Sequence, residues 1–254
     1  MTVAEHQGSF QIGRVVSRTF SVISRNFVIF LAAAALIMLP IVAIDFYNGT
    51  PNAVASGLAK GWRMAAVAFT VQIVCTYLLQ ASLVRGAITD MNGEKPSLGS
   101  ALSTGFGLIV PVFIISILFL LGMAAGMILL IVPGIMLAVA WAVVIPVRVV
   151  ENTGISETFG RSRALTKGYR WPIFWLVILY TIAAILTGAL IGVITGVSFG
   201  RAAAVNGNVP YIVMTWAVQV VLAIVSSVGV SAVYYELRTV KEGIAPEQLA
   251  AAFD

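Results

Sequence analysis

Few residues in this sequence could do chemistry, and the familiar catalytic patterns are absent from it. The single histidine, His6, lies near the N-terminus, and the single cysteine, Cys75, lies within an apolar segment. The sequence has no His, Cys and carboxylate cluster with metal-ligand spacing, no G-x-S-x-G motif, no phosphate-binding loop and no dinucleotide fingerprint. We therefore expect a protein that is not an enzyme and that holds no metal or cofactor.

The first candidate site is a strip of polar side chains inside an apolar segment. Gln72, Thr76 and Gln80 recur every four residues, which places them on one face if the segment is helical. Two interpretations stay open: hydrogen bonds between membrane helices, or the lining of a substrate cavity. A cavity would favour a transporter, whereas tight packing would favour a scaffold.

The second candidate site is a cluster of charges beside the apolar segments of the C-terminal half. Its members are Glu151, Arg163, Lys167, Glu236 and Arg238. Pairing of the two carboxylates with these cations, or with Arg14 and Arg18, would clamp amphipathic segments against the rest of the protein. If the carboxylates were unpaired, they would instead become candidate ligand-binding or enzymatic groups.

The elements that position these residues belong to a membrane protein. The chain has 254 residues, of which 60% are hydrophobic and 10% are charged, and its mean hydropathy is +1.01. Soluble domains carry about 25% charged residues. The composition therefore argues against a soluble globular protein and against a disordered one.

Uncharged stretches locate the membrane spans, because charged side chains are costly at the centre of a bilayer. Lys95 and Arg148 enclose 52 uncharged residues, which hold two spans if the chain reverses at Pro133-Gly134. The alternative is one long bent helix through Pro133, which would give five spans. We predict six spans, at residues 27–44, 64–84, 108–131, 135–150, 171–197 and 210–235.

An amphipathic segment precedes each pair of spans. In the first segment, apolar residues recur at steps of three and four from Ile12 to Phe27, and Arg14, Arg18 and Arg25 recur on another face. The predicted interfacial helices cover residues 10–26, 96–106 and 155–170. We thus expect an all-α polytopic membrane protein, a single domain over residues 1–254 with three helical hairpins, each preceded by an interfacial helix. This order predicts an internal triplication, although any membrane hairpin also needs basic ends and glycine turns.

Small residues predict close helix packing. Gly188, Gly192, Gly196 and Gly200 recur every four residues in the fifth predicted span. Such a ladder lets another backbone approach closely. Its partner stays open between another helix of this chain, a second copy of the chain, and lipid. Gly122 and Gly126 make a shorter version in the third predicted span.

The basic residues orient the protein in the membrane. With six spans, 12 Lys and Arg residues share the side of the N-terminus, and only Lys60, Arg63 and Arg201 lie on the other side. The positive-inside rule then predicts that both termini are cytoplasmic. Since topology accounts for the pI near 9.6, nucleic acid is not an expected partner. The expected partners are membrane lipids, other envelope membrane proteins or a second copy of the chain.

Several short motifs follow one another along the chain. They are Pro133-Gly134, Pro146 with Glu151-Asn152, Arg161 to Trp171, and Tyr234 to Gly243. Together with the segment from Ser17 to Phe27, they resemble the glycerophosphoryl diester phosphodiesterase membrane-domain superfamily, which is similar to the YciC-like bacterial inner-membrane proteins. The resemblance implies a six-helix fold in a bacterial inner membrane. The phosphodiesterase barrel of some members has no counterpart here, so their activity is not carried over.

These observations lead to two functional hypotheses. The first is a non-enzymatic bacterial inner-membrane protein that binds lipid or scaffolds envelope partners. The alternative is a transporter or permease component for an amphiphilic or lipid-like substrate.

Overall fold

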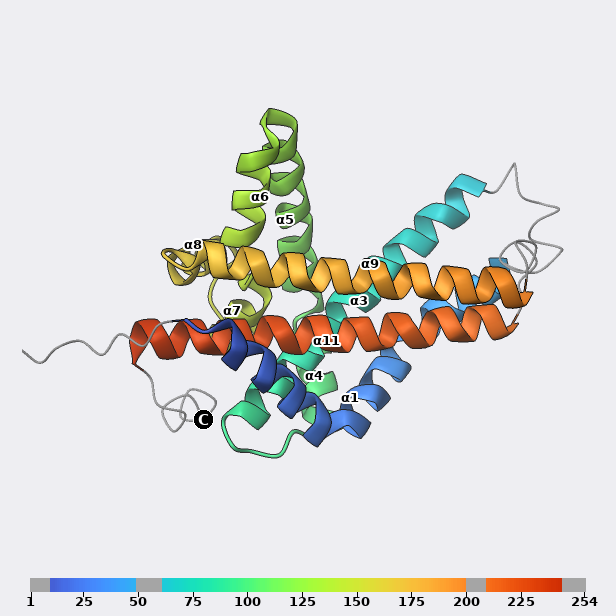
Figure 1. Cartoon of the computed structure of the whole chain (residues 1–254), viewed down its shortest axis with the longest axis horizontal. Helices are drawn as coiled ribbons and strands as arrows, with labels where there is room; N and C mark the ends of the chain where they lie inside the picture. Colours follow the sequence, from blue (N-terminus) through green and yellow to red (C-terminus); the bar gives the residue numbers. More distant parts are fainter. Residues whose placement is uncertain (1–9, 49–60, 200–208, 244–254) are drawn as a thin grey trace, which may run out of the picture.

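The computed structural model describes residues 10–48, 61–199 and 209–243, and these residues form helices joined by turns (Figure 1). The helices are α1 (Ile12–Asn48), α3 (Gly61–Met91), α4 (Leu98–Gly107), α5 (Ile109–Leu129), α6 (Ile131–Ala140), α7 (Val144–Glu151), α8 (Ile155–Thr166), α9 (Arg170–Phe199) and α11 (Val209–Glu242). With α6 and α7 taken together, six segments are long and apolar enough to cross a membrane. This confirms the predicted all-α fold of a multi-pass membrane protein.

The first amphipathic segment and the first span form one helix, α1, with a kink where they meet. Asn26 has non-helical torsion angles (φ −119°, ψ 19°), at the boundary predicted from the sequence. Its side-chain amide donates hydrogen bonds to the carbonyl of Val22 at 3.1 Å and to the carboxylate of Asp90 at 2.7 Å. Arg25 pairs with the same carboxylate at 2.6 Å. The kink in α1 is therefore fixed against the end of α3.

The chain reverses between the third and fourth spans at Leu130, and the predicted reversal at Pro133-Gly134 is wrong by three residues. Leu130 is extended (φ −166°, ψ 142°), and α6 begins directly after it. Pro133 falls in the first turn of α6, where a helix does not need its N–H. Gly134 serves packing instead, since a Cβ atom there would lie 2.8 Å from the backbone nitrogen of Met127. The reversal excludes the single bent helix.

The fourth span, predicted as continuous over residues 135–150, is broken into α6 and α7. The backbone nitrogen of Val144 donates to the carbonyl of Trp141 at 3.1 Å, and a turn over residues 141–143 separates the two helices. The carbonyl of Ala140 instead accepts hydrogen bonds from the hydroxyls of Ser162 at 3.0 Å and Thr166 at 3.1 Å. Because a buried carbonyl needs a partner, α8 is docked at this break.

Each amphipathic helix packs against the end of an even-numbered span, which is the second helix of a hairpin. The pairs are α4 on α3, α8 on α7, and the first half of α1 on α11. The α4 contact is close, because a Cβ atom on Gly105 would lie 2.1 Å from the hydroxyl oxygen of Ser82. The same kind of contact thus occurs three times in the described chain, and the triplication stays a prediction.

The spans are buried to very different extents. In Figure 1, α9 and α11 run side by side, whereas α5 and α6 project away from them. The hydroxyl of Tyr180 donates to the carbonyl of Leu222 at 3.2 Å and ties α9 to α11. Nevertheless, none of the residues in the most apolar 18-residue stretch of α9 is buried. The fifth span therefore exposes its apolar side chains at the surface of the described chain.

Candidate functional site

The first charged site joins the amphipathic half of α1 to α11. The carboxylate of Glu236 is buried, with 2% of its side chain exposed, and it pairs with Arg14 at 2.6 Å and with Arg18 at 3.2 Å. The guanidinium of Arg18 also lies 4.6 Å from the centre of the Tyr235 ring. A buried carboxylate requires such partners because burial disfavours its charge. The predicted pairing of Glu236 with Arg14 and Arg18 is confirmed, and we call these three residues the α1 clamp.

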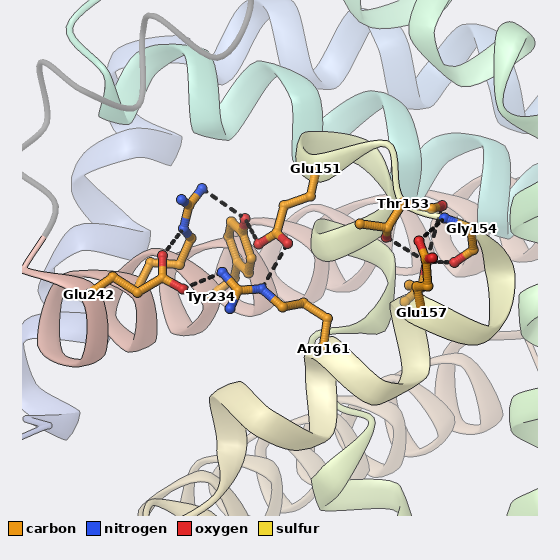
Figure 2. A network of polar contacts seen from close by, with 9 residues as sticks. Glu151, Thr153, Gly154, Glu157, Arg161, Tyr234 and Glu242 are labelled. Carbon is orange, nitrogen blue, oxygen red and sulfur yellow. Dashed lines mark hydrogen bonds and ion pairs between the residues drawn. The ribbon is translucent and has the colours of Figure 1, made fainter.

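The second charged site is a closed ring of five side chains from α7, α8 and α11, and Figure 2 shows how these side chains point toward one another. Glu151 accepts from Nε of Arg161 at 2.8 Å and from the hydroxyl of Tyr234 at 2.9 Å. Glu242 accepts from Nε of Arg238 at 2.8 Å and from the second arm of Arg161. Arg238 closes the ring by donating to the oxygen of Tyr234 at 3.3 Å. We call this group the α11 ring; its two anions and two cations balance.

The α11 ring is built to hold helices together. Each of its carboxylates accepts from two donors, so both are already occupied. Burial acts to lower the pKa of Arg161, but the hydrogen bonds and charges of Glu151 and Glu242 outweigh it and raise that pKa above its ordinary value. The arginine therefore stays charged across the physiological pH range, and the ring joins three helices.

The sequence placed Glu236 and Arg238 in one cluster, and the structure corrects this. Residues two apart point to opposite sides of a helix, so Glu236 faces α1, whereas Arg238 pairs with Glu242, which also pairs with Arg161 of α8. Tyr234 and Glu242 were missed in the sequence. Their spacing from Arg238, four residues on either side, is a signal that could have found them, because it puts all three on one face of α11.

The partner predicted for Glu151 also needs correction. Glu151 pairs with Arg161 and with neither Arg163 nor Lys167. Arg161 is half-buried next to the buried Ser162, whereas Arg163 is exposed on α8 and Lys167 is exposed just beyond its last residue. The sequence showed that α8 is basic but could not show which of its faces meets α7.

The polar strip of α3 forms a bond along its own helix. Gln72, Thr76 and Gln80 are all half-buried, and the side-chain amide of Gln72 donates to the hydroxyl of Thr76 at 3.3 Å. Of the two interpretations left open by the sequence, the pair Gln72 and Thr76 shows no bond between described helices but a bond within α3.

The glycines of α5 pack closely, whereas those described in α9 do not. A Cβ atom would lie 2.5 Å from the ring of Trp141 at Gly122, and 2.9 Å from the Cα of Gly134 at Gly126. At Gly188 and Gly192 it would meet nothing within 4 Å. The surroundings of Gly196 and Gly200 lie outside the described residues. Among the described residues, the close packing within the chain that such a ladder allows is therefore not seen at Gly188 and Gly192.

The amphipathic half of α1 has three distinct faces. One face is buried and contains Val15 and Val22, and a second face exposes Phe20 and Phe27. The third face is polar and borders an open depression of about 580 Å³. Its lining residues are Gln11, Gly13, Arg14, Ser17, Arg18, Ser21 and Arg25.

Comparisons of the chain with protein-family models, with curated proteins and with solved structures find no match. Among the residues that the structure describes, no three His, Cys, Asp or Glu side chains come together as a metal site.

Proposed function

We propose that this protein is a non-enzymatic protein of the bacterial inner membrane that binds anionic lipid at the cytoplasmic surface, with both termini in the cytoplasm. The observation that carries the proposal is the three-faced half of α1. The α1 clamp holds one side of this helix against the bundle, while Phe20 and Phe27 are exposed on another side. A helix divided in this way lies between the acyl chains and the headgroups of a leaflet.

The charges of the chain support the orientation and the lipid class. Lys and Arg are 12 on one side and 3 on the other side of the six spans. This asymmetry favours a cytoplasmic position for the amphipathic helices. Anionic lipids of the cytoplasmic leaflet attract basic residues near the surface. The inner membrane and membership of the glycerophosphoryl diester phosphodiesterase membrane-domain superfamily are part of the proposal, on the motifs described above.

The proposal is tested by the lipid that accompanies the purified protein. We would extract the protein in mild detergent, identify the retained phospholipids by mass spectrometry and compare them with the surrounding membrane. We expect phosphatidylglycerol and cardiolipin to be enriched over phosphatidylethanolamine. Retained lipid of the same composition as the membrane would contradict the proposal.

The exposure of α9 favours a second candidate, a scaffold for other membrane proteins or for a second copy. Its open glycines would let another helix approach closely. Cross-linking in lipid nanodiscs, with light scattering of the products, tests this candidate. A transporter stays the alternative, and it would require the Gln72 strip to open toward a substrate path.

A further inference from the structure

Basic side chains that the ion pairs do not use gather where α8 turns into α9. Arg163 is exposed on α8, Lys167 is exposed directly after the last residue of α8, and Arg170 begins α9. Gly168 (φ +92°) allows the turn between the two helices. The ammonium of Lys241, at the end of α11, donates to the carbonyl of Ala164, and the charges of Lys167 and Arg170 act on it. We call Arg163, Lys167, Arg170 and Lys241 the basic junction.

The neighbouring carboxylates are already engaged elsewhere. Glu151 and Glu242 belong to the α11 ring, and Glu157 accepts from the backbone nitrogen of Gly154 at 3.1 Å at the other end of α8. Within residues 10–48, 61–199 and 209–243, no carboxylate forms an ion pair with the basic junction. In that same part of the chain, the buried Nε of Arg170 has no hydrogen-bond partner. The junction therefore carries four positive charges beside a ring that is neutral.

Aromatic residues place the basic junction at headgroup depth. Trp171 and Trp175 are 73% and 57% exposed, and each makes an edge contact with the ring of Phe174. Exposed tryptophans at the end of a membrane span lie in the interface between headgroups and acyl chains. Since α9 enters the apolar layer directly after Arg170, the four charges lie above an exposed apolar helix.

We propose that the basic junction binds the phosphate headgroup of an anionic glycerophospholipid whose acyl chains lie along α9. This inference rests on the proposed function and names the site that serves it. The ammonium and guanidinium groups supply charge and N–H donors for phosphate oxygens. The exposed rings of Trp171 and Trp175 offer apolar contact that an acylated phosphate can use and a free phosphate cannot. Four charges suit two phosphates, so cardiolipin binds more tightly than phosphatidylglycerol.

The polar face of α1 is a weaker place for the same headgroup. Arg14 and Arg18 already neutralise Glu236, and Arg25 pairs with Asp90. The carboxylates of Glu236 and Asp90 thus neutralise most of the positive charge of this face. The basic junction has no carboxylate paired with it in the described structure, and it adjoins α9, the span with the smallest buried share.

The test compares lipid binding by delipidated wild-type protein and by two variants. The first variant, Arg163→Gln with Lys167→Gln, changes exposed side chains that make no ion pair in the described structure. The control, Arg63→Gln with Lys95→Gln, removes the same charge elsewhere. Native mass spectrometry with added cardiolipin, phosphatidylglycerol or phosphatidylethanolamine measures the affinity. We expect the control to bind cardiolipin like wild type and the first variant to bind it about tenfold more weakly or worse.

Each outcome decides between the site and the broader proposal. If wild type prefers anionic lipid and the Arg163/Lys167 variant binds equally well, the site is wrong and the proposed function stands. If wild type binds the three lipids equally, both are overturned. If millimolar inorganic phosphate displaces the lipid completely, the junction is a free-phosphate site. Should the double variant fail to fold by circular dichroism, Trp171→Leu replaces it, and unchanged cardiolipin affinity in that variant overturns the site.

Discussion

Ser162 of α8 donates a hydrogen bond from its hydroxyl to the backbone carbonyl of Ala140, the last residue of α6, at 3.0 Å. Thr166 donates to the same carbonyl at 3.1 Å. Both hydroxyl residues are fully buried. The break in the fourth span is therefore an attachment point, at which α8 satisfies a carbonyl that the interrupted helix leaves without its usual partner.

Removing both hydroxyls should loosen this attachment. We expect Ser162→Ala with Thr166→Val to lower the free energy of unfolding by about 1–3 kcal/mol, because a buried carbonyl loses its partners. Chemical unfolding in detergent micelles measures the loss. Ser156→Ala, on the exposed start of α8, is the control and should change stability little. A double variant as stable as wild type would show that water or another donor replaces the hydroxyls.

The α1 clamp should be sensitive to loss of its arginines. Arg14→Gln with Arg18→Gln leaves the carboxylate of Glu236 buried without a cation, and we expect a loss of about 3–5 kcal/mol in unfolding free energy. The matched control is Arg25→Gln, whose side chain is 57% exposed and whose loss should cost about 1 kcal/mol or less. Equal losses of unfolding free energy in the two variants would mean that the burial of Glu236 does not strengthen its dependence on these arginines.

Weakening the α11 ring should loosen α8 and leave the membrane-spanning helices intact. Glu151→Gln removes the charge that pairs with Arg161 but keeps an oxygen for Tyr234, so we expect faster hydrogen exchange across Ile155–Thr166. The stability cost should be about 1–3 kcal/mol, the range for hydrogen bonds to charged groups. Glu94→Gln, an exposed change, is the control. Unchanged exchange in α8 would refute the role of the ring as a clamp.

Two glycine substitutions should behave in opposite ways. Gly126→Leu would drive a side chain into the backbone of Gly134, so we expect a loss of about 1–3 kcal/mol in thermal unfolding experiments. Gly192→Leu should leave the stability of the monomer unchanged, because space is open at that position. If Gly192→Leu instead abolishes a cross-linked dimer, the fifth span packs against a second copy. Loss of monomer stability would contradict the exposed position of α9.

The topology makes a prediction that reporter fusions can check. From the 12-to-3 asymmetry of Lys and Arg, fusions at Gly49, Gly93, Gly154 and Gly207 should report outside, inside, inside and outside. Alkaline phosphatase and fluorescent protein fusions distinguish the two sides. A cytoplasmic reporter at Gly207 would rule out both the six-span topology and the proposed orientation.

The sequence by itself determined the features that depend on local composition and period. Uncharged stretches located the six spans, because the cost of a charge in lipid applies wherever that charge occurs. Periodicity in the first segment located the amphipathic half of α1 and placed its boundary at Asn26, where the kink occurs. A cationic partner for Glu236 could also be expected, because a carboxylate at the end of a membrane span is costly without a positive charge beside it.

Only the tertiary structure decided which faces of these helices meet. Arg161 and Arg163 are equally basic. Because of the way α8 is rotated against α7 and α11, only Arg161 contacts Glu151 and Glu242 in the α11 ring. The same holds for glycines, which pack closely in α5 and lie open in α9 although their spacing is alike. The physical reason is that charge and hydropathy belong to single residues, whereas a hydrogen bond or a backbone contact requires two elements at a set distance and rotation.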